Sequence, residues 1–322
     1  MAEKNDYVNR ELSWIEFNYR VLSEARDKST PLFDRLKFLS ITASNLDEFY
    51  MVRVASLKDM VHAKYAKKDI AGLTAKEQLD KISEKTHQLV DLQYSTYNRS
   101  LVPALKQNGL RIVMEHEDLT EDEAAFADEY FHKNVYPVLT PMAFDSSRPF
   151  PLIRNKTLNI AALLKKKNEK EAELEFAMVQ VPSVIPRIVE LPEEKDEDGE
   201  NQRVVILLEE IIERNMDKLF LNYDIVCAHP FRIMRNADLS IDEDEAADLL
   251  KEIEKQLKKR QWGEAIRLEI ESNVDKQLLK ILKKELSISS EDIFQISGPL
   301  DLTFLMKMYG LDGFDHLKTP KY

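Results

Sequence analysis

Glycine and cysteine are both scarce in this sequence of 322 residues. It has 7 glycines and contains no GxGxxG and no GxxxxGK(S/T) string, so it has neither a Rossmann nor a P-loop cradle for nucleotide phosphates. The single cysteine, Cys227, excludes an intramolecular disulfide and a cysteine-rich zinc site. If the protein handles a nucleotide, it holds the phosphates by other means.

Long apolar runs and an excess of positive charge are also missing. The N-terminal segment has no apolar stretch typical of a signal peptide, and no run of about 18 apolar residues predicts a transmembrane helix. The formal net charge of −12 disfavours nucleic-acid binding and autonomous binding of a long polyanion, because both need a basic field. Local basic patches are compatible with this balance. We expect a protein of the reducing cytoplasm, with no transmembrane segment and no nucleic-acid partner.

The first part of the sequence has strong helical periodicity. Apolar side chains recur at the spacing of a helix face over residues 12–22 and 32–39. Thr30-Pro31 is typical of an N-cap followed by the first helical position. The pattern pauses at residues 42–45 and resumes at Phe49, so we expect a break between two helical segments there.

A further long helix is predicted after Gly72. Thr74 is a plausible cap with Glu77 at the capping-box spacing, and the helix runs to about Leu105. Asn108-Gly109 is typical of a helix end. Long helices with short joints indicate an antiparallel helical bundle, which we assign to residues 1–108.

From residue 109 onward, short apolar segments alternate with helical ones. Besides an apolar run at 110–113, the predicted strands are 157–164, 176–181, 203–208, 231–234 and 265–270. The predicted helices are 120–134, 208–219, 243–260 and 273–286. Residues 137–151 contain four prolines and form the longest irregular region, and the acidic residues 193–201 predict an exposed hairpin or loop. We expect an α+β multidomain protein, with the helical bundle followed by an α/β head domain at 109–318.

No catalytic residue and no metal ligand is predicted in this chain. None of the histidines forms HxxxH or HExxH; they are His62, His87, His116, His132, His229 and His316. Cys227 and His229, two residues apart in an apolar run, are more typical of core packing than of catalysis. An acidic group lacks the glycine of an EF-hand and is better explained as the start of a helix; it comprises Asp238, Asp242, Asp244 and Glu245.

Several segments, in order and spread over nearly the whole chain, resemble the polyphosphate kinase family. In the helical part they are NRELSWIEFNYRVLSEA (9–25) and LKFLSITASNLDEFYMVRV (36–54). In the second part they are RPFPLIRNKTLNIA (148–161), FRIMRNADLSIDEDEAADLL (231–250), GEAIRLEI (263–270) and GPLDLT (298–303). Because one such string is weak evidence and an ordered series is strong, we take the family as the working hypothesis.

This resemblance implies a Mg²⁺-dependent enzyme that reversibly moves the terminal phosphate of ATP onto inorganic polyphosphate through a phosphorylated histidine. It also implies that the N-terminal domain lies against the adenine of bound ATP and that the head domain contributes to dimerisation. The implied partners are ATP or ADP, inorganic polyphosphate and a second copy of the chain.

The family's nucleotide-contact asparagine falls on Asn45, the one ATP-binding residue that we predict. An amide carries donors and an acceptor, so it can match a purine edge or a ribose. The alternative is that Ser44 or Asn45 caps a helix, with Asp47 or Glu48 at the capping-box position. Both roles are compatible, because a capping side chain can also border a pocket.

The sequence leaves two interpretations open for several arginines and phenylalanines. Arg10, Arg20 and Arg53 are candidates for phosphate or intersubunit contacts, but a solvated helix face with partners such as Glu16 for Arg20 is the simpler interpretation. Phe144 and Phe150, in the proline-rich region, either contribute to dimerisation or pack onto their own domain.

In the family, the chain continues beyond the position of Tyr322 into two phospholipase-D-like domains. Those domains hold the phosphorylated histidine, a second catalytic histidine, and the arginines that hold magnesium and phosphate. No histidine here lies in a segment that resembles the phosphorylated site. We therefore expect a fragment without the C-terminal catalytic domains, inactive by itself. Alternatives are a non-catalytic dimerisation or scaffold module and, against the acidic balance, a polyphosphate-binding protein without turnover.

Overall fold

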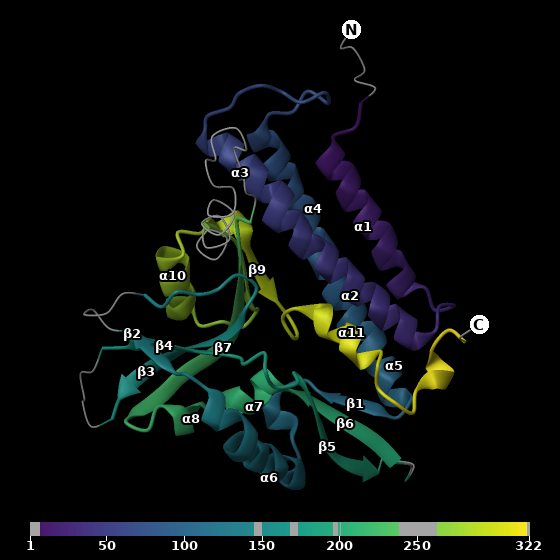
Figure 1. Ribbon diagram of the computed structural model, residues 1–322, viewed down its shortest axis with the longest axis vertical. Coiled ribbons are helices and arrows are strands. Elements are labelled where there is room, and N and C mark those ends of the chain that lie inside the picture. Colours follow the sequence, from purple (N-terminus) through teal and green to yellow (C-terminus); the bar gives the residue numbers. More distant parts are fainter. Residues whose placement is uncertain are drawn as a thin grey trace, which may run out of the picture.

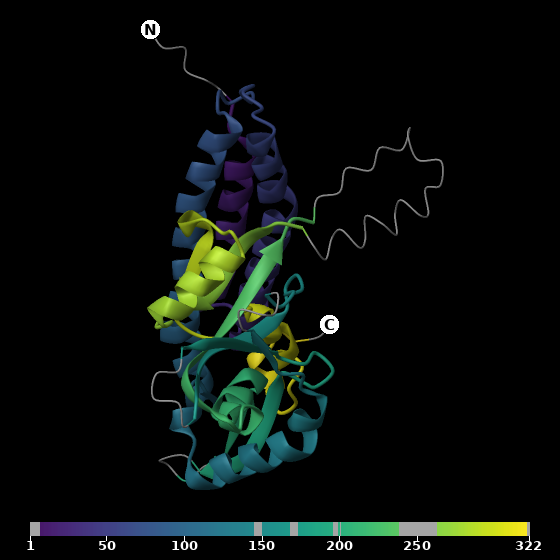
Figure 2. The ribbon, with the colours of Figure 1, turned by 90° about the vertical axis from the view of Figure 1, so that its left-hand side faces the viewer.

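A computed structural model describes residues 7–144, 150–167, 173–195, 199, 201–237 and 263–320. The predicted helix 243–260 and the acidic group at 238–245 lie outside these ranges. The molecule is elongated, with the tops of the long helices at one end, the small sheet towards the other, and part of the large sheet beside the helices (Figures 1 and 2). This arrangement confirms the predicted helical part followed by a mixed α/β part. Within the described ranges, no helix combines the length and apolar character needed to cross a bilayer.

The helical part consists of long helices joined by short turns. Its elements are α1 (Arg10–Arg26), α2 (Leu32–Phe49), the π-helical turn η1 (Tyr50–Val54), α3 (Ala55–His62), α4 (Ala75–Thr96), the π-helical turn η2 (Tyr97–Leu101) and α5 (Val102–Gln107). The predicted capping box of α4 is present, with both the Thr74 and the Glu77 bonds made. After α5 the chain turns at Gly109, whose φ of 81° is a left-handed conformation that favours glycine.

The predicted break at residues 42–45 is wrong, because α2 runs without interruption from Leu32 to Phe49. Polar side chains in this stretch bond within or beside the helix: the Thr42 hydroxyl donates to the Phe38 carbonyl at 2.8 Å. The change in helix geometry comes later, in η1. The start of α2 also differs by one residue from the prediction, since Pro31 rather than Thr30 is the N-cap.

Most strands belong to a six-stranded sheet with the order β2-β4-β3-β7-β8-β9. Its strands are β2 (Met142–Phe144), β3 (Leu158–Lys166), β4 (Glu175–Gln180), β7 (Tyr223–Arg235), β8 (Ala265–Glu271) and β9 (Ile293–Ile296). All neighbours are antiparallel except β8 and β9, which are parallel. The sequence did not predict β2 or β9, and β7 begins well before the predicted residues 231–234.

A smaller sheet has the order β1-β6-β5. It contains β1 (Leu110–Val113), β5 (Ile188–Lys195) and β6 (Asn201–Leu207), with β1 parallel and β5 antiparallel to β6. Residues 193–195 end β5 and Asn201 begins β6; this antiparallel pairing agrees with the hairpin of the predicted hairpin or loop, but β5 was not foreseen. The remaining helices are α6 (Glu121–Tyr130), α7 (Leu208–Arg214), α8 (Met216–Leu219), α10 (Lys276–Glu285) and α11 (Leu305–Met308).

The last part of the chain returns to the helices. Helix α11 lies against α2, and the ring of Phe314 stacks on Phe33 with centroids 5.1 Å apart (Figure 1). The ring of Phe294, in β9, meets Tyr50 edge-on at 5.9 Å. One apolar core consequently runs through the helices, the small sheet and one face of the large sheet. The helix carrying Asn45 is held between segments from both ends of the chain.

Phe144 and Phe150 pack onto their own sheet. Phe144 meets Phe150 edge-on at 5.6 Å, and Phe150 lies 5.1 Å from Phe176 of β4, all measured between ring centroids. This aromatic group joins a second core that is covered by α10. Of the two interpretations of these phenylalanines, the structure shows packing within their own domain.

Candidate functional site

Asn45 lies in the second half of α2 and faces α1. Its Nδ2 donates to the Asn18 Oδ1 at 3.1 Å, and the Asn18 Nδ2 donates to the Thr42 carbonyl at 3.1 Å. Asn18 is fully buried, whereas Asn45 is partly exposed. The side-chain carbonyl oxygen of Asn45, Oδ1, accepts no hydrogen bond from the described residues. A buried partner thus orients the amide and leaves its acceptor side available to a ligand.

The helix-capping interpretation of Ser44 and Asn45 is wrong. Both residues lie inside α2, well away from its first turn, so neither satisfies a free backbone N–H at a helix start. Ser44 is exposed, and the Asn45 side chain bonds sideways to another helix rather than to its own backbone. Cross-helix orientation, and not capping, is the structural role of Asn45.

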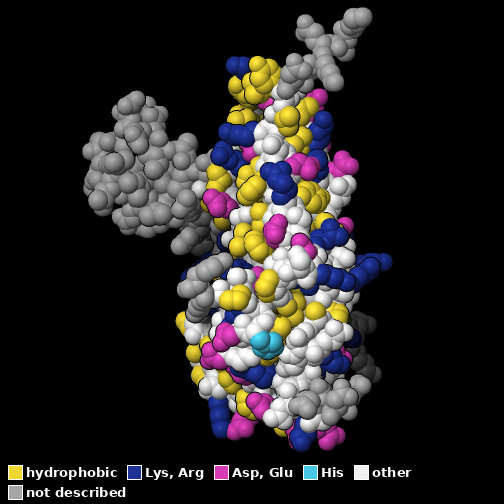
Figure 3. Space-filling model, turned by 90° about the vertical axis from the view of Figure 1, so that its right-hand side faces the viewer, with side chains coloured by type: hydrophobic (Ala, Val, Ile, Leu, Met, Phe, Trp, Pro, Cys, Tyr) yellow, Lys and Arg dark blue, Asp and Glu magenta, His cyan; other side chains and the backbone are white. Residues whose placement is uncertain are grey.

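The three arginines suggested by the sequence do not converge. Arg10 and Arg20 are both on α1, about 15 Å apart along its axis at 1.5 Å per residue, and Arg53 is exposed in η1. Arg20 is two residues from Asn18, about 200° around the helix, so it points away from α2. Its side chain lies over the Phe17 ring at 5.8 Å, while Glu16, its suggested partner, pairs with Lys85 instead. On the face of the molecule seen in Figure 3, basic and acidic side chains alternate.

A buried ionic cluster lies on the other side of α2. The Arg232 guanidinium bonds the carboxylate of Asp47 through one nitrogen and that of Glu269 through another at 2.9 Å. Lys156 lies 3.2 Å from Asp47, and Arg267 lies 2.8 Å from Glu269. Arg232 and Asp47 are each 2% exposed, so this pair is sealed from solvent. This cluster could not be predicted from the sequence, because its members come from separate strands and helices.

The charges of the cluster support one another. Burial disfavours the charge of Arg232, but the carboxylates of Asp47, Glu269 and Asp301 outweigh burial and raise its pKa well above the ordinary value. Asp47 and Asn45 are two residues apart, about 200° around α2, so they point to opposite sides. Pairing of Asp47 with the sheet therefore sets the rotation of α2 that turns Asn45 towards α1.

The GPLDLT segment forms a firmly held loop beside this cluster. Asp301 has a φ of 57°, which is uncommon for a residue other than glycine. Arg187 donates to the backbone carbonyl of Asp301 at 2.9 Å, and the Tyr94 hydroxyl donates to the Pro299 carbonyl at 2.9 Å. The Asp301 carboxylate accepts a hydrogen bond from the Thr303 hydroxyl at 2.5 Å. These bonds fix the loop on the helices and account for its unusual backbone.

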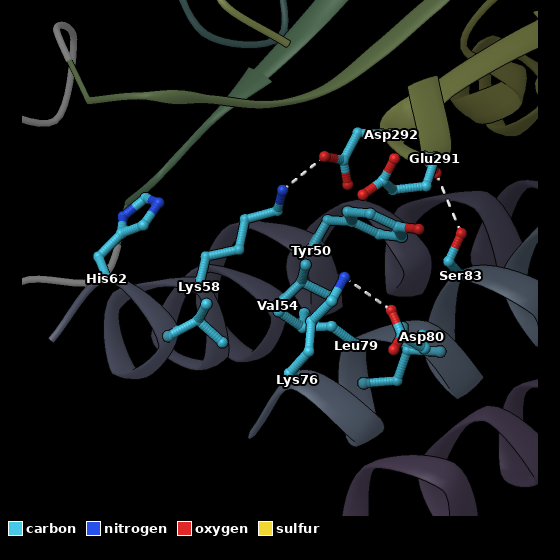
Figure 4. Close-up of a pocket in the computed structure, with 12 residues that line it drawn as sticks. Tyr50, Val54, Lys58, His62, Lys76, Leu79, Asp80, Ser83, Glu291 and Asp292 are labelled. Carbon is cyan, nitrogen blue, oxygen red and sulfur yellow. Dashed lines mark hydrogen bonds and ion pairs between the residues drawn. The ribbon is translucent and has the colours of Figure 1, made fainter. Parts of the chain in front are cut away.

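A cavity of about 180 Å³ opens between α3, the start of α4 and the segment before β9 (Figure 4). Its basic groups are paired: the Lys58 Nζ lies 2.5 Å from Asp292, and the Lys76 Nζ lies 2.8 Å from Asp80. His62 lies on its rim, 3.6 Å from Glu264. Asn45 does not line this cavity. Its paired lysines leave little free charge to attract a phosphate.

A second cavity, of about 290 Å³, is acidic. Glu115, Glu209, Glu210 and Glu271 line it together with the Ser297–Leu300 backbone. His229 lies beside it, with its Nδ1 2.7 Å from Glu271. Burial disfavours the charge on His229, but hydrogen bonds with Cys227 and Glu271 outweigh burial and raise its pKa to about 9. Carboxylates surrounding this cavity repel an anionic substrate.

The histidines are distributed over separate environments. His87 stacks on Phe294 with centroids 3.9 Å apart, His116 lies 3.5 Å from Glu210, and His229 pairs with Glu271. In the described part of the chain, no group of three or more histidine, cysteine or acidic residues is arranged to hold a metal ion. These residues therefore do not fit a magnesium centre, and we assign no reaction step to a metal here.

Comparisons with known proteins match both parts of the chain. The family model described as the polyphosphate kinase N-terminal domain matches residues 7–113, and the one described as the middle domain matches residues 122–308. A polyphosphate kinase of Lactiplantibacillus plantarum is 49% identical over 317 residues, covering 98% of this chain and 43% of the relative. Polyphosphate kinase 1 of Chlorobaculum tepidum is 40% identical over 314 residues, covering 97% of this chain and 45% of the relative.

The fold also matches a solved structure. The crystal structure of polyphosphate kinase from Porphyromonas gingivalis aligns with a TM-score of 0.79 and 27% sequence identity, covering 98% of this chain and 43% of that chain. The chain thus spans less than half the length of the relatives that it matches.

Proposed function

The chain belongs to the polyphosphate kinase family, and on this premise we propose that it is the nucleotide-contacting and assembly part of an ATP:polyphosphate phosphotransferase. In this proposal the whole enzyme reversibly transfers the terminal phosphate of ATP to inorganic polyphosphate through a phosphohistidine. Asn45 contributes a contact on the adenine side of ATP. The head domain contributes to a homodimer, and the enzyme works in the cytoplasm.

The oriented amide of Asn45 is the observation that carries the proposal. Asn18 holds its Nδ2, and the Asp47–Arg232 pair on the opposite side of α2 holds the helix that presents it. A side chain that is already fixed before the ligand binds loses little conformational entropy on binding. The free energy of its hydrogen bond to the ligand is therefore not cancelled by an entropic cost. The free carbonyl oxygen of Asn45 is suited to accept a hydrogen bond from an exocyclic amine such as that of adenine.

The described residues position a substrate rather than react with it. Phosphoryl transfer depends on cations placed around the transferred group. The buried arginines of the ionic cluster are already bound to carboxylates, His229 is paired with Glu271, and His87 is stacked on Phe294. We therefore propose that this chain alone transfers no phosphate, and that Mg²⁺ of the full-length enzyme is held outside the residues described here.

Replacement of Asn45 tests the nucleotide contact. With the ¹⁵N-labelled 322-residue chain titrated with ATP, we expect millimolar binding, seen as shifts of amide signals around α1 and α2. Asn45→Ala should weaken this binding roughly two- to tenfold, the equivalent of one hydrogen bond between neutral groups. Ser44→Ala removes an exposed neighbour on the same helix and should leave the binding constant unchanged.

Circular dichroism of Asn45→Ala should match that of the unaltered chain, because α2 keeps its packing and its ionic anchor. An Asn45→Ala chain that binds ATP with the same constant as the Ser44→Ala chain would remove Asn45 from the nucleotide site.

A further inference from the structure

A polar groove lies between the end of α1 and the junction of α4 with η2. Its volume is about 480 Å³, larger than that of the two cavities described above. Its lining residues are Ser23, Arg26, Asp27, Leu92, Ser95, Thr96, Arg99 and Ser100. Asn45 does not line the groove, which belongs to a different face of the bundle from the α1–α2 contact.

Two exposed arginines on the groove are free to bind an anion. Within the described part of the chain, neither Arg26 nor Arg99 forms a hydrogen bond or an ion pair. The one carboxylate in the groove, Asp27, accepts hydrogen bonds at 2.8 Å from both the backbone N–H and the hydroxyl of Ser29. These bonds lower the pKa of Asp27, so it stays ionised; both are made to its Oδ1, and its negative charge offsets part of the positive charge of the groove.

A third arginine lies buried behind the groove. Arg35 is 6% exposed, and it donates to the Ala25 carbonyl at 2.9 Å and to the Ser100 hydroxyl at 2.7 Å. No carboxylate of the described residues lies within ion-pair distance of it. A buried cation is normally paired. Arg35 is balanced only in part, by Asp27 beyond ion-pair distance, and it adds positive potential behind the groove.

Hydroxyl groups complete the lining. Because Ser100 accepts its hydrogen bond from Arg35, its own O–H proton is left to donate. The Ser95 hydroxyl makes no hydrogen bond with the described residues. The π-helical turn η2 places Arg99 and Ser100, and such turns occur frequently at functional sites.

The groove differs in charge from the other cavities. The lysines of the cavity in Figure 4 are paired with Asp292 and Asp80, and the cavity beside His229 is lined by four glutamates. Among the described residues, the groove has three arginines within or behind it against one carboxylate, that of Asp27. The chain as a whole has a formal net charge of −12, so this local excess of positive charge sets the groove apart from the rest of the molecule.

We propose that this groove is a subsite for a phosphoanhydride chain, namely a segment of inorganic polyphosphate. This inference rests on the proposed function and names a second place where the enzyme holds its polymeric substrate. Arginine forks bind phosphate oxygens in pairs, and serine hydroxyls donate to the oxygens between them. A phosphate polymer offers several anionic groups to the two exposed arginines, whereas orthophosphate offers one.

Calorimetric titration of the 322-residue chain with tripolyphosphate at low ionic strength tests this subsite. We expect measurable binding that falls at least tenfold in the double variant Arg26→Ala/Arg99→Ala. The matched control, Arg154→Ala/Lys81→Ala, removes the same net charge from exposed residues elsewhere and should keep the affinity within twofold. Equal affinities in the two double variants would overturn the proposal.

Two further titrations separate the sources of phosphate. Orthophosphate and ATP should bind this groove at least tenfold more weakly than tripolyphosphate, and their equal affinity would overturn the assignment to a polymer. Asn45→Ala should leave tripolyphosphate binding unchanged, so loss of the subsite and loss of the nucleotide contact are distinguishable. Since Arg26 and Arg99 are exposed, their replacement should leave the thermal midpoint of the chain unaltered, which circular dichroism checks.

Discussion

Arg232 shows what a single buried charge does in this molecule. Its guanidinium joins Asp47 of α2 to Glu269 of β8, and all three residues are at most 6% exposed. Such a pair is not a large net source of stability, because desolvation of the ions offsets their attraction. It is costly to break, however, because Asp47 and Glu269 then stay buried with only Lys156 and Arg267 to balance them. Arg232 therefore specifies how the helix sits on the sheet.

Arg232→Met should lower the free energy of unfolding by about 3–5 kcal/mol, because it leaves two carboxylates buried beside one another. Urea denaturation followed by circular dichroism measures this loss. Arg154→Met, at an exposed position, should change stability by less than about 0.5 kcal/mol. Adding Asp47→Asn to Arg232→Met should restore part of the loss, since it removes one of the two carboxylates that Arg232 held together. A loss below about 1 kcal/mol for Arg232→Met would show that the cluster is solvated.

Among the elements, the start of α4 was predicted from its capping box, and the helix containing α6 was predicted without reference to one. Both α4 and α6 have the box, formed by Thr74 with Glu77 and by Thr120 with Glu123. The threonine hydroxyl oxygen accepts a hydrogen bond from the glutamate N–H three residues later, and the glutamate carboxylate accepts one from the threonine N–H. All the groups involved lie within four residues, so the motif can be recognised from the sequence. The continuity of α2 was not readable in this way, since its polar stretch at 42–45 is satisfied by contacts with α1.

Thr74→Ala should lower stability by about 1 kcal/mol, because it removes the oxygen that accepts the Glu77 N–H at the start of α4. Thr74→Ser keeps that oxygen and should retain most of the stability. Denaturant midpoints of the two variants provide the comparison. Equal midpoints for alanine and serine would mean that α4 is held by packing alone.

At the scale of the whole molecule, the last segment of the chain completes the helical part. Helix α11 covers α2, Phe314 stacks on Phe33, and the Thr319 N–H donates to the Asp34 carboxylate at 2.7 Å. The small sheet pairs β1, which follows the helices, with β6, which comes about ninety residues later in the order of the chain. Local sequence divides the protein into a bundle and a head domain, yet its apolar core is continuous between them.

Residues 7–113 expressed alone should lack a cooperative thermal transition. Their helices would expose the faces that α11, Phe294 and Phe314 cover in the whole chain, together with the unpaired carboxylate of Asp47. Dye binding to exposed apolar surface and melting followed by circular dichroism compare this fragment with residues 1–322. A transition with the same midpoint in both would show that the bundle folds independently of the head domain.

The candidate site divides in the same way. Asn45 was predicted through the resemblance of its neighbouring residues to a family, and its orientation by Asn18 could not be read from spacing. Arg26, Arg35 and Arg99 gave no signal in sequence, because they belong to different helices and resemble ordinary solvated arginines. Only the packing of α1 against α4 shows that they converge on one groove.

The sequence by itself determined the family, the order of helical and α/β parts, the capping box of α4, and the absence of a glycine-rich phosphate loop. These depend on residues within a few positions of one another, where backbone hydrogen bonding is local. Only the tertiary structure decided which way α2 turns, which arginines are free, and where positive charge collects. These depend on contacts such as that between Arg232 and Asp47, 185 residues apart, whose formation requires the whole chain to fold.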